Sequence, residues 1–198
     1  MLVAYGDIRS GNCLKVKWML DWLGRDYRWV ETDIMSGGSR TPEFLALSTA
    51  GQVPVIVFED GRPLAQSNAI LLHLGEGTVF IPNDAYDRAR MLEWMFWEQY
   101  SHEPYVAVAR FQRLYLGKAA SDVEARIMER GEAALDRLEG ALDMRDWLAG
   151  DSATLADVAL VAYTRMAADG GFDLTARPAT RTWIARVEAV LGLGPYAA

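Results

Sequence analysis

The sequence is poor in cysteine and histidine, and each shortage excludes a class of site. Its 198 residues contain one cysteine, Cys13, and two histidines, His73 and His102. A single cysteine excludes a disulfide framework within the chain and fits a reducing compartment. Neither histidine has neighbours at the spacing of metal ligands, so we predict no metal site.

Positive charge in excess and long apolar runs are also missing. The formal net charge is −7 at pH 7, which argues against a nucleic-acid binder, because such proteins normally present a basic face. No uncharged apolar stretch reaches the roughly 18 residues needed to span a bilayer, and Asp7 and Arg9 interrupt the start of the chain. We therefore expect a soluble, cytoplasmic protein.

Apolar residues are nevertheless plentiful. They make up 51% of the chain, which is enough to build a core and is not typical of a disordered protein. The length fits one large domain or two small ones. We find no internal repeat and no low-complexity tract.

The first part of the chain alternates between strand and helix patterns. Strands are expected at 2–5, 27–32, 55–58 and 64–65, and helices at 13–23, 43–47 and 68–74. The turn signal at 59–62 predicts a hairpin, and Ser67 is expected to cap the third helix. A crossover joining parallel strands, followed by a hairpin, predicts a small mixed sheet.

The composition changes at 75–87 to glycine, proline, asparagine and aspartate, which indicates a linker. Beyond it the patterns are helical, with helices expected at 89–100, 123–142, from Thr154 onward, and at 181–191. Thr154 and Asp157 form a capping box, in which Thr154 accepts from the N3 amide and Asp157 reaches back to the cap. We therefore predict an α/β domain at 1–75, a linker at 76–86 and an all-α domain at 87–198.

The segment Gly51-Gln52-Val53-Pro54-Val55 places a proline at the start of an apolar strand. Proline lacks an N–H and is poorly tolerated inside a central strand. One explanation is a cis Val53–Pro54 bond, which would turn the chain sharply and expose the backbone of Val53. The other is an ordinary trans proline at a strand start, and this motif alone leaves both open.

Two helix starts carry polar residues that could bind a ligand. Gln66-Ser67 precedes the third helix, and Ser10-Gly11-Asn12-Cys13 precedes the first. The first turn of a helix suits a carboxylate or a thiolate, because it offers unpaired N–H groups and a partial positive charge. Each motif taken alone is better explained by simple helix capping.

The order and spacing of these motifs resemble the N-terminal half of the glutathione transferase family. Segments 5–16, 40–45, 51–54 and 66–67 look like those of its bacterial cytosolic members, which carry a Ser-x-Asn turn. The capping box at 154–157 matches the one that the family carries in its second half. The resemblance covers nearly the whole chain. It implies an α/β thioredoxin-like domain with a mixed four-stranded sheet and an all-α helical domain after it.

By this resemblance, the α/β domain would bind glutathione as a cosubstrate. Gln66 and Ser67 would hold its γ-glutamyl end, and the backbone of Val53, displayed by a cis Pro54, would pair with its cysteinyl segment. The resemblance places Gln52 and Arg40 near its glycine carboxylate.

The resemblance also implies a hydroxyl or amide donor for the glutathione thiolate. We select Ser10, with Asn12 second. Tyr5 is a rival, although its place in an apolar strand favours a packing role. Cys13 could be a redox nucleophile with a lowered pKa, but no second cysteine accompanies it, so we interpret it as a small packing residue.

In the helical domain the resemblance implies an electrophile pocket, for which His102 and Tyr105 are the candidate lining residues. The aromatic-rich stretch around them is more often core or dimer surface than substrate pocket. The family also implies a homodimer, and no membrane or nucleic-acid partner is expected.

The resulting functional hypothesis is a glutathione transferase acting in detoxification, which conjugates the glutathione thiolate to electrophilic small molecules. One alternative is a glutathione-dependent disulfide or peroxide reductase. Another is a non-catalytic, transferase-like binding module, because a fold does not dictate a function.

Overall fold

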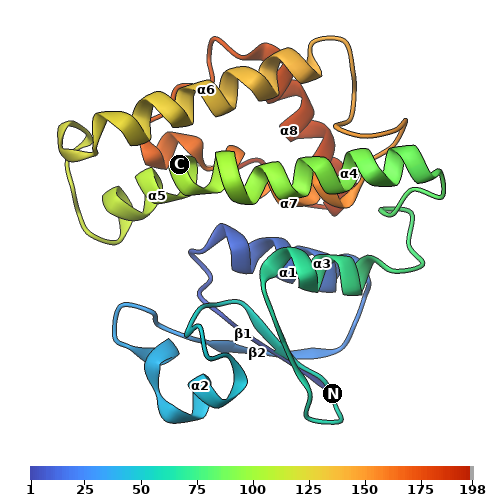
Figure 1. Cartoon of the computed structure of the whole chain (residues 1–198), viewed down its shortest axis with the longest axis vertical. Helices are drawn as coiled ribbons and strands as arrows, with labels where there is room; N and C mark the ends of the chain where they lie inside the picture. The colour runs from blue at the N-terminus through green and yellow to red at the C-terminus, as the bar shows by residue number, and fades with distance from the viewer. Residues whose placement is uncertain (197–198) are drawn as a thin grey trace. The chain divides into compact units, whose positions relative to one another are not determined.

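The computed structural model describes residues 1–196, and the chain forms two compact units, Met1–Glu76 and Gly77–Ala198 (Figure 1). Among the described residues, no helix combines the length and the apolar character that crossing a lipid bilayer requires.

The first unit is an α/β domain built on a four-stranded sheet. Its elements are β1 (Leu2–Gly6), α1 (Gly11–Trp22), β2 (Tyr27–Glu31), α2 (Pro42–Leu47), β3 (Val55–Val57), β4 (Pro63–Ala65) and α3 (Ser67–Gly75). The strand order is β2-β1-β3-β4. The β1–β2 pair is parallel, whereas the β1–β3 and β3–β4 pairs are antiparallel. The predicted mixed, thioredoxin-like sheet is thereby confirmed.

Apolar residues explain the layering of this unit. α1 and α3 lie on one face of the sheet and α2 on the other (Figure 1). Four side chains from the sheet, α1 and α3 are fully buried and form part of the core of the domain: Ala4, Ile56, Val16 and Ile70. Burying such side chains is the main favourable contribution to the stability of the domain.

The predicted role of Ser67 as a helix cap is wrong. α3 begins at Ser67 itself, and Gln66 is the N-cap residue without a side-chain cap hydrogen bond. The Ser67 hydroxyl instead donates to Oδ1 of Asn12, at 3.1 Å. The hydroxyl that a local cap would use is therefore bonded to Asn12, which lies 55 residues away in sequence.

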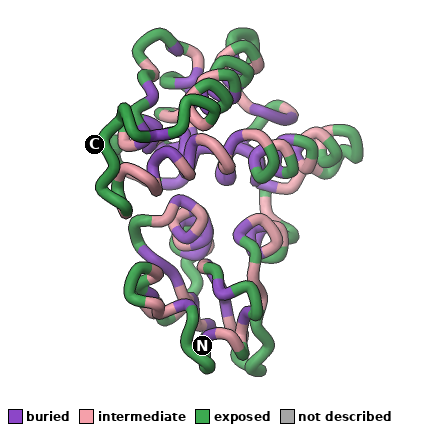
Figure 2. Tube along the Cα trace, turned by 60° about the vertical axis from the view of Figure 1, so that its left-hand side comes forward, coloured by how far each residue is buried: buried purple, intermediate pink, exposed green. Residues whose placement is uncertain are grey.

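The second unit is all helical, as predicted. It contains α4 (Ala85–Trp97), a π-helical segment (Glu98–His102), α5 (Glu103–Leu114), α6 (Ala125–Leu142), α7 (Leu155–Thr164) and α8 (Pro178–Leu191). All ten residues of α7 are buried, which makes this helix the centre of the unit. Figure 2 shows buried residues inside each unit and exposed residues on its loops and on the outer sides of its helices.

Two helix starts in this unit show how side chains set the boundaries. α4 begins earlier than predicted, because Oδ1 of Asp84 accepts from the backbone N–H groups of Tyr86 and Asp87, at 2.9 and 3.0 Å. At α7, Oδ2 of Asp157 accepts from the backbone N–H of Thr154 at 2.8 Å, which is the predicted reach-back bond of the capping box.

Candidate functional site

The topology of the sheet brings the sequence motifs of the first unit to one edge. Tyr5 near the end of β1 pairs with Val55 at the start of β3, and Val55 pairs with Ala65 at the end of β4. Because these pairs are antiparallel, the turn after β1, the segment before β3 and the segment after β4 all lie at the same edge. The predicted residues around positions 10, 53 and 67 are therefore neighbours in the fold.

The segment before β3 has the backbone form that the resemblance implied. The Val53–Pro54 peptide bond is cis, so the open choice between cis and trans is settled in favour of cis. Gln52 is exposed and Val53 is half-buried, whereas Pro54 is buried. Exposure along this segment therefore decreases from Gln52 to Pro54 as the chain enters β3.

The segment after β4 contains an uncommon backbone conformation. Gln66 has φ 70° and ψ 110°, and among the described residues it is the only non-glycine residue with a positive φ. Such conformations are held in place by the surrounding structure and gather at functional sites. The strained residue immediately precedes the first turn of α3, where backbone N–H groups point out of the helix.

Two side-chain hydrogen bonds connect the first turn of α3 to α1. Ser67 donates to Asn12 at 3.1 Å, and the ammonium of Lys15 donates to Oδ1 of Asn68 at 2.8 Å. Ser67 is 4% exposed and Lys15 is completely buried. These two bonds therefore hold the starts of α1 and α3 together. Each start carries the partial positive charge of a helix N-terminus.

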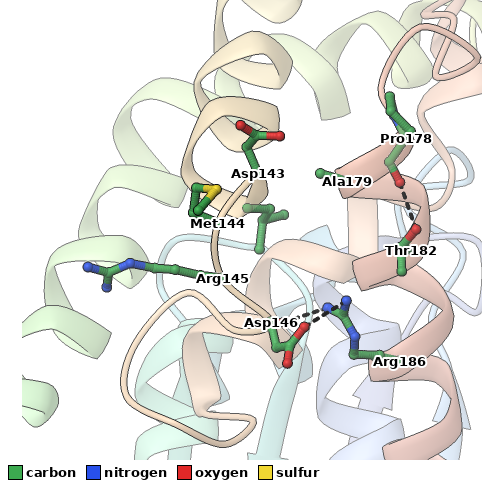
Figure 3. Close-up of a pocket in the computed structure, with 9 residues that line it drawn as sticks. Asp143, Met144, Arg145, Asp146, Pro178, Ala179, Thr182 and Arg186 are labelled. Carbon is green, nitrogen blue, oxygen red and sulfur yellow. Dashed lines mark hydrogen bonds and ion pairs between the residues drawn. The ribbon is translucent and has the colours of Figure 1, made fainter.

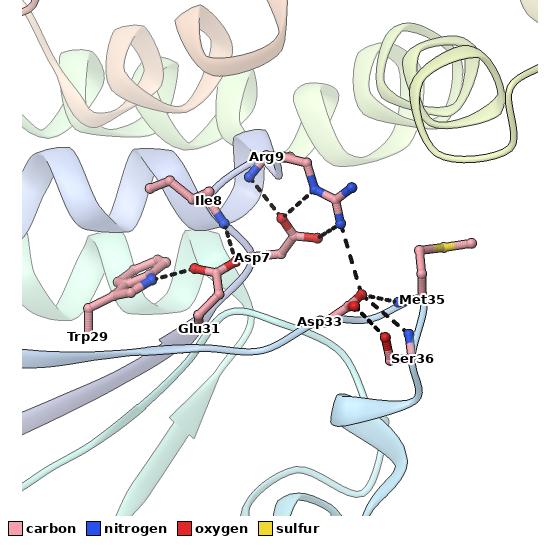
Figure 4. A network of polar contacts seen from close by, with 8 residues as sticks. All are labelled: Asp7, Ile8, Arg9, Trp29, Glu31, Asp33, Met35 and Ser36. Carbon is pink, nitrogen blue, oxygen red and sulfur yellow. Dashed lines mark hydrogen bonds and ion pairs between the residues drawn. The ribbon is translucent and has the colours of Figure 1, made fainter.

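The turn between β1 and α1 is fixed by a buried carboxylate (Figure 4). Oδ1 of Asp7 accepts from the backbone N–H of Arg9 at 2.8 Å, and the Arg9 guanidinium contacts both Asp7 oxygens at 3.2 Å. The backbone N–H of Ser10 donates to the carbonyl of Asp7 at 2.9 Å. Ser10 consequently sits at the N-cap of α1 on a turn with little freedom.

A second carboxylate ties this turn to β2. Glu31 accepts from the backbone N–H of Ile8 at 3.0 Å and from the indole N–H of Trp29 at 2.8 Å (Figure 4). A Cβ added at Gly6 would lie 2.5 Å from the Trp29 ring, so glycine is required there.

The sequence reasoning missed the supporting carboxylates Asp7 and Glu31. The spacing of Asp7 and Arg9 is typical of an Asx-turn, a signal that was present in the sequence. The role of Glu31, in contrast, depends on the strand register.

Ser10 and Cys13 are in contact at the start of α1. The Ser10 side chain hydrogen-bonds to the Cys13 thiol, and Cys13 is completely buried. Burial raises the pKa of the Cys13 thiol to about 12, although hydrogen bonds from Ser10 and the Asp7 backbone act in the opposite direction. The helix start therefore does not turn this cysteine into a thiolate at neutral pH, and its environment agrees with a packing role.

Arg40 lies beside the loop that leads to Gln52. Its Nη1 donates to the carbonyl of Ala50 at 3.2 Å. A Cβ added at Gly51 would lie 2.4 Å from the same nitrogen, and Gly51 has φ +60°. The positive φ favours glycine at position 51, and the Arg40 guanidinium lies beside this residue, next to Gln52 in the chain.

Tyr5 has a packing partner of its own. It lies on β1, and its ring meets that of Phe44 of α2 edge to face, with centroids 6.1 Å apart. Aromatic contacts of this geometry stabilise a core by about 0.5–1.5 kcal/mol beyond burial. This contact fits the strand-packing role that the sequence favoured for Tyr5.

The two residues predicted for an electrophile pocket lie in the helical unit. His102 ends the π-helical segment and is completely buried, with Nε2 3.1 Å from the Thr164 hydroxyl. Tyr105 lies on α5 and is half-buried. π-helical turns inside longer helices are often found at functional sites.

The helical unit also has a surface pocket of about 490 Å³ between the end of α6 and the start of α8 (Figure 3). Asp146 and Arg186 form an ion pair in it, at 2.8 Å, and Met144 and Thr182 also line it. It contains none of the residues predicted for the site. Within residues 1–196 no group of three or more histidine, cysteine, aspartate or glutamate side chains is arranged to hold a metal ion.

The sheet edge therefore offers several hydrogen-bond donors, and the described residues contain no metal-binding cluster. The first turns of α1 and α3 provide outward N–H groups, and the edge adds the hydroxyl of Ser10 and the amide of Asn12. Such an arrangement can hold an anionic ligand and favour a thiolate over a thiol.

Two family models and a curated relative match this chain. Residues 9–76 match the family model of the glutathione S-transferase N-terminal domain, and residues 96–190 match that of its C-terminal domain. The disulfide-bond oxidoreductase YfcG of Escherichia coli (strain K12) is 30% identical over 189 residues, which cover 90% of this chain and 86% of YfcG.

Solved structures give the same result. A glutathione S-transferase from Xanthobacter autotrophicus Py2 superposes with a TM-score of 0.92 at 45% identity, over 100% of this chain and 96% of that protein. Ure2p in complex with glutathione superposes with a TM-score of 0.85 at 25% identity, over 98% of this chain and 97% of that protein.

Proposed function

Because the chain belongs to the glutathione S-transferase family, we propose that it binds glutathione in its α/β unit and conjugates the glutathione thiolate to electrophilic small molecules. The observation that carries this proposal is the Ser67–Asn12 hydrogen bond of 3.1 Å. It joins the start of α3, suited to a carboxylate, to the start of α1, suited to a thiolate. The glutathione bound to Ure2p supports the choice of ligand.

In this proposal the sheet edge divides the binding of the tripeptide among three segments. The first turn of α3, with Gln66 and Ser67, holds the γ-glutamyl carboxylate. The backbone of Val53 would pair with the cysteinyl segment, while Gln52 and Arg40 would approach the glycine carboxylate. The positive φ of Gln66 supports this assignment, because strain of about 1–3 kcal/mol is retained where function requires it.

The thiol of glutathione would lie at the start of α1, where Ser10 and Asn12 donate hydrogen bonds to the thiolate. Cys13 stays a thiol at neutral pH, so its S–H can donate to the Ser10 oxygen and leave the Ser10 proton for the glutathione sulfur. A thiol pKa lowered by about two units requires roughly 2.7 kcal/mol of preference for the charged form. Two hydrogen bonds to a charged acceptor, each contributing about 1.5–3 kcal/mol, supply that preference. The thiolate then attacks an electrophilic carbon, and the protein contributes orientation and the lowered pKa.

For the electrophile we propose Tyr105 as the contacting residue, because it is half-buried on α5. His102 is completely buried and lies 3.1 Å from the Thr164 hydroxyl. His102 would therefore affect the electrophile pocket mainly by shaping the helix, and less by contacting the electrophile.

A glutathione-dependent disulfide reductase is the second candidate, because the relative YfcG is a disulfide-bond oxidoreductase. The same bound thiolate would attack sulfur instead of carbon. Cys13 would not be the attacking group, because burial raises its pKa to about 12. The reducing equivalents would then come from glutathione itself.

We also propose a homodimer. Phe96 and Tyr100 support it, because they are 71% and 84% exposed on the helical unit. Large exposed aromatic side chains are enriched at protein interfaces. Size-exclusion chromatography with light scattering measures the mass directly, and a monomer at micromolar concentration would contradict the dimer.

The function is tested by turnover of two substrates with glutathione, a chloronitroaromatic compound and a small mixed disulfide. Faster conjugation of the chloronitroaromatic compound is expected for a transferase, and faster reduction of the disulfide would favour the reductase. Replacing Ser10 and Asn12 together by alanine should abolish turnover while glutathione binding persists. Glutathione binding without turnover of either substrate by the wild type would indicate a binding module.

A further inference from the structure

We propose that Asp7 is a positioning residue for the glutathione thiol, acting through the turn that carries Ser10 and the start of α1. This inference rests on the proposed function and deepens it, because it assigns a task to a buried carboxylate next to the thiolate site. Asp7 directly follows β1 and is completely buried. Its side chain accepts from the backbone N–H of Arg9 at 2.8 Å and from the Arg9 guanidinium at 3.2 Å (Figure 4).

Two groups of Asp7 close the turn between β1 and α1. The carboxylate bonds the N–H two residues further on, which is the geometry of an Asx-turn. The carbonyl of Asp7 accepts from the N–H of Ser10 at 2.9 Å, and the carbonyl of Ser10 accepts from Cys13 and Leu14 at 3.0 and 2.9 Å. A continuous series of hydrogen bonds therefore connects Asp7 to the first turn of α1.

Ser10 depends on this turn for its position. It is the N-cap residue of α1, in an extended conformation with φ −84° and ψ 124°, and its side chain makes no cap hydrogen bond. The backbone bonds from Asp7 onward therefore decide where the hydroxyl and the first-turn N–H groups lie. Hydrogen bonds weaken steeply when donor and acceptor are misaligned, so a displaced turn would stabilise a bound thiolate less well.

The charge of Asp7 acts against a thiolate. Burial is the main cause of the raised pKa of the Cys13 thiol, and the negative charges of Asp7 and Glu31 add to it. A carboxylate charge that reaches the start of α1 disfavours a second anion there. The benefit of Asp7 to a bound thiolate is therefore geometric, and its effect has the opposite sign to that of its charge. The charged side chains of the first unit at this turn and on the first turns of α1 are Asp7, Arg9, Lys15, Glu31 and Asp33.

Two substitutions separate the turn from the charge, and the readout is the pKa of the glutathione thiol in saturated complexes, measured from the ultraviolet absorbance of the thiolate. Asp7→Asn keeps a side-chain acceptor for the Asx-turn and removes the charge, so the thiol pKa should equal the wild-type value or fall below it. Asp7→Glu keeps the charge but is one methylene longer, so its carboxylate no longer fits the turn. The thiol pKa should then rise by about one unit, the size expected for one misplaced hydrogen bond to a charged acceptor.

Asp60 provides a matched control in the same unit. Its carboxylate accepts from the backbone N–H of Arg62 at 3.1 Å and from Nε of Arg62 at 2.7 Å, which repeats the arrangement of Asp7 and Arg9. This turn lies between the end of β3 and the start of β4, at the opposite edge of the sheet. Asp60→Glu should leave the thiol pKa unchanged, and circular dichroism checks that all three variants keep the wild-type fold.

The outcomes distinguish this inference from the proposed function. If wild-type protein lowers the thiol pKa and Asp7→Glu lowers it equally, Asp7 does not position the site, and the proposed function stands without it. A raised thiol pKa in Asp7→Asn would also overturn the inference, even if Asp7→Glu does not fold, because asparagine keeps the turn. If wild-type protein does not bind glutathione, or binds it with an unshifted thiol pKa, the proposed function fails and the inference fails with it.

Discussion

The Ser10 side chain hydrogen-bonds to the thiol of Cys13, the only cysteine of the chain, and both residues lie at the start of α1. Helix starts and hydroxyl donors normally favour thiolates. Here the burial of Cys13 outweighs them and raises its pKa to about 12. The same helix start can therefore stabilise a thiolate delivered by a ligand at its surface while the cysteine beneath remains a thiol.

Cys13 should consequently be unreactive in the folded protein. A pH of 8 lies far below the Cys13 pKa of about 12, so almost no thiolate is present. The side chain is also completely buried, so a reagent cannot reach the sulfur. We expect negligible reaction with an aromatic disulfide reagent under native conditions and reaction of one thiol per chain after unfolding in guanidinium. Rapid labelling of the native protein would contradict the burial of Cys13. Loss of catalysis in a correctly folded Cys13→Ala variant would show that Cys13 has a catalytic role.

Asp157 should be essential for the stability of the helical unit. Its buried carboxylate accepts from the backbone N–H of Leu148 and Thr154, from the Thr154 hydroxyl and from the indole of Trp183. Asp157→Ala leaves these buried donors without their acceptor, so we expect a loss of about 3 kcal/mol or more in the free energy of unfolding. Urea denaturation measures it.

Asp151→Ala is the matched control, because Asp151 is an exposed aspartate shortly before the same helix. It should change the free energy of unfolding by less than about 0.5 kcal/mol. Equal effects of the two substitutions would show that the buried network around Asp157 does not carry the stability.

Glu139 should stabilise the fold in a pH-dependent way. Its carboxylate on α6 accepts from the N–H groups of Ala179 and Thr180 at the start of α8, at 3.0 and 2.8 Å. Partial burial pushes the Glu139 pKa up, but the bonds from Thr180 and Ala179 prevail and hold it below the ordinary value of 4.5. The stabilisation is therefore present above pH 4.5 and is lost as the pH falls through the lowered folded pKa.

We expect Glu139→Gln to lower the free energy of unfolding by about 0.5–1 kcal/mol at pH 7, because the site is largely solvated and screened. The difference from wild type should shrink in acid, as measured by urea denaturation at several pH values. Glu129→Gln, an exposed change on the same helix, should show neither effect. A difference for Glu139→Gln that grows in acid would contradict the assignment.

Gly131 and Gly140 of α6 should respond oppositely to alanine. A Cβ at Gly131 would lie 2.3 Å from Cζ of Phe172, a buried ring, whereas nothing lies within 4 Å of one at Gly140. Overpacking costs about 1–3 kcal/mol and exceeds the gain in helix propensity, about 1 kcal/mol, that both substitutions bring. Thermal denaturation should show Gly131→Ala destabilised and Gly140→Ala stabilised, and stabilisation of both would contradict the packing of Phe172.

Much of the fold could be predicted from local signals in the sequence. The run Val55–Val57 and the turn after it indicated a hairpin, and Thr154 with Asp157 indicated the start of α7. The cis bond before Pro54 could be anticipated only from the family resemblance, because the local sequence allows both isomers. These features depend on neighbouring residues or on a known motif.

The errors and omissions concern contacts between distant residues and one irregular helical segment. Ser67 was expected to cap its own helix, but Asn12 on another helix accepts its proton. The π-helical segment Glu98–His102 was not predicted, because its wider hydrogen-bond spacing has no marker in the residue pattern. Glu31 entered the site only once the β1–β2 register placed it opposite Gly6.

The most direct test of the account is a pH titration of the ultraviolet thiolate absorbance of glutathione bound to the purified protein, in wild type and in a variant that carries Ser10→Ala and Asn12→Ala. We predict that wild-type protein lowers the thiol pKa by about two units and that the variant binds glutathione with a pKa near that of the free tripeptide. An unshifted pKa in the wild type, or an equally lowered one in the variant, would contradict the claim that this sheet edge activates the thiol.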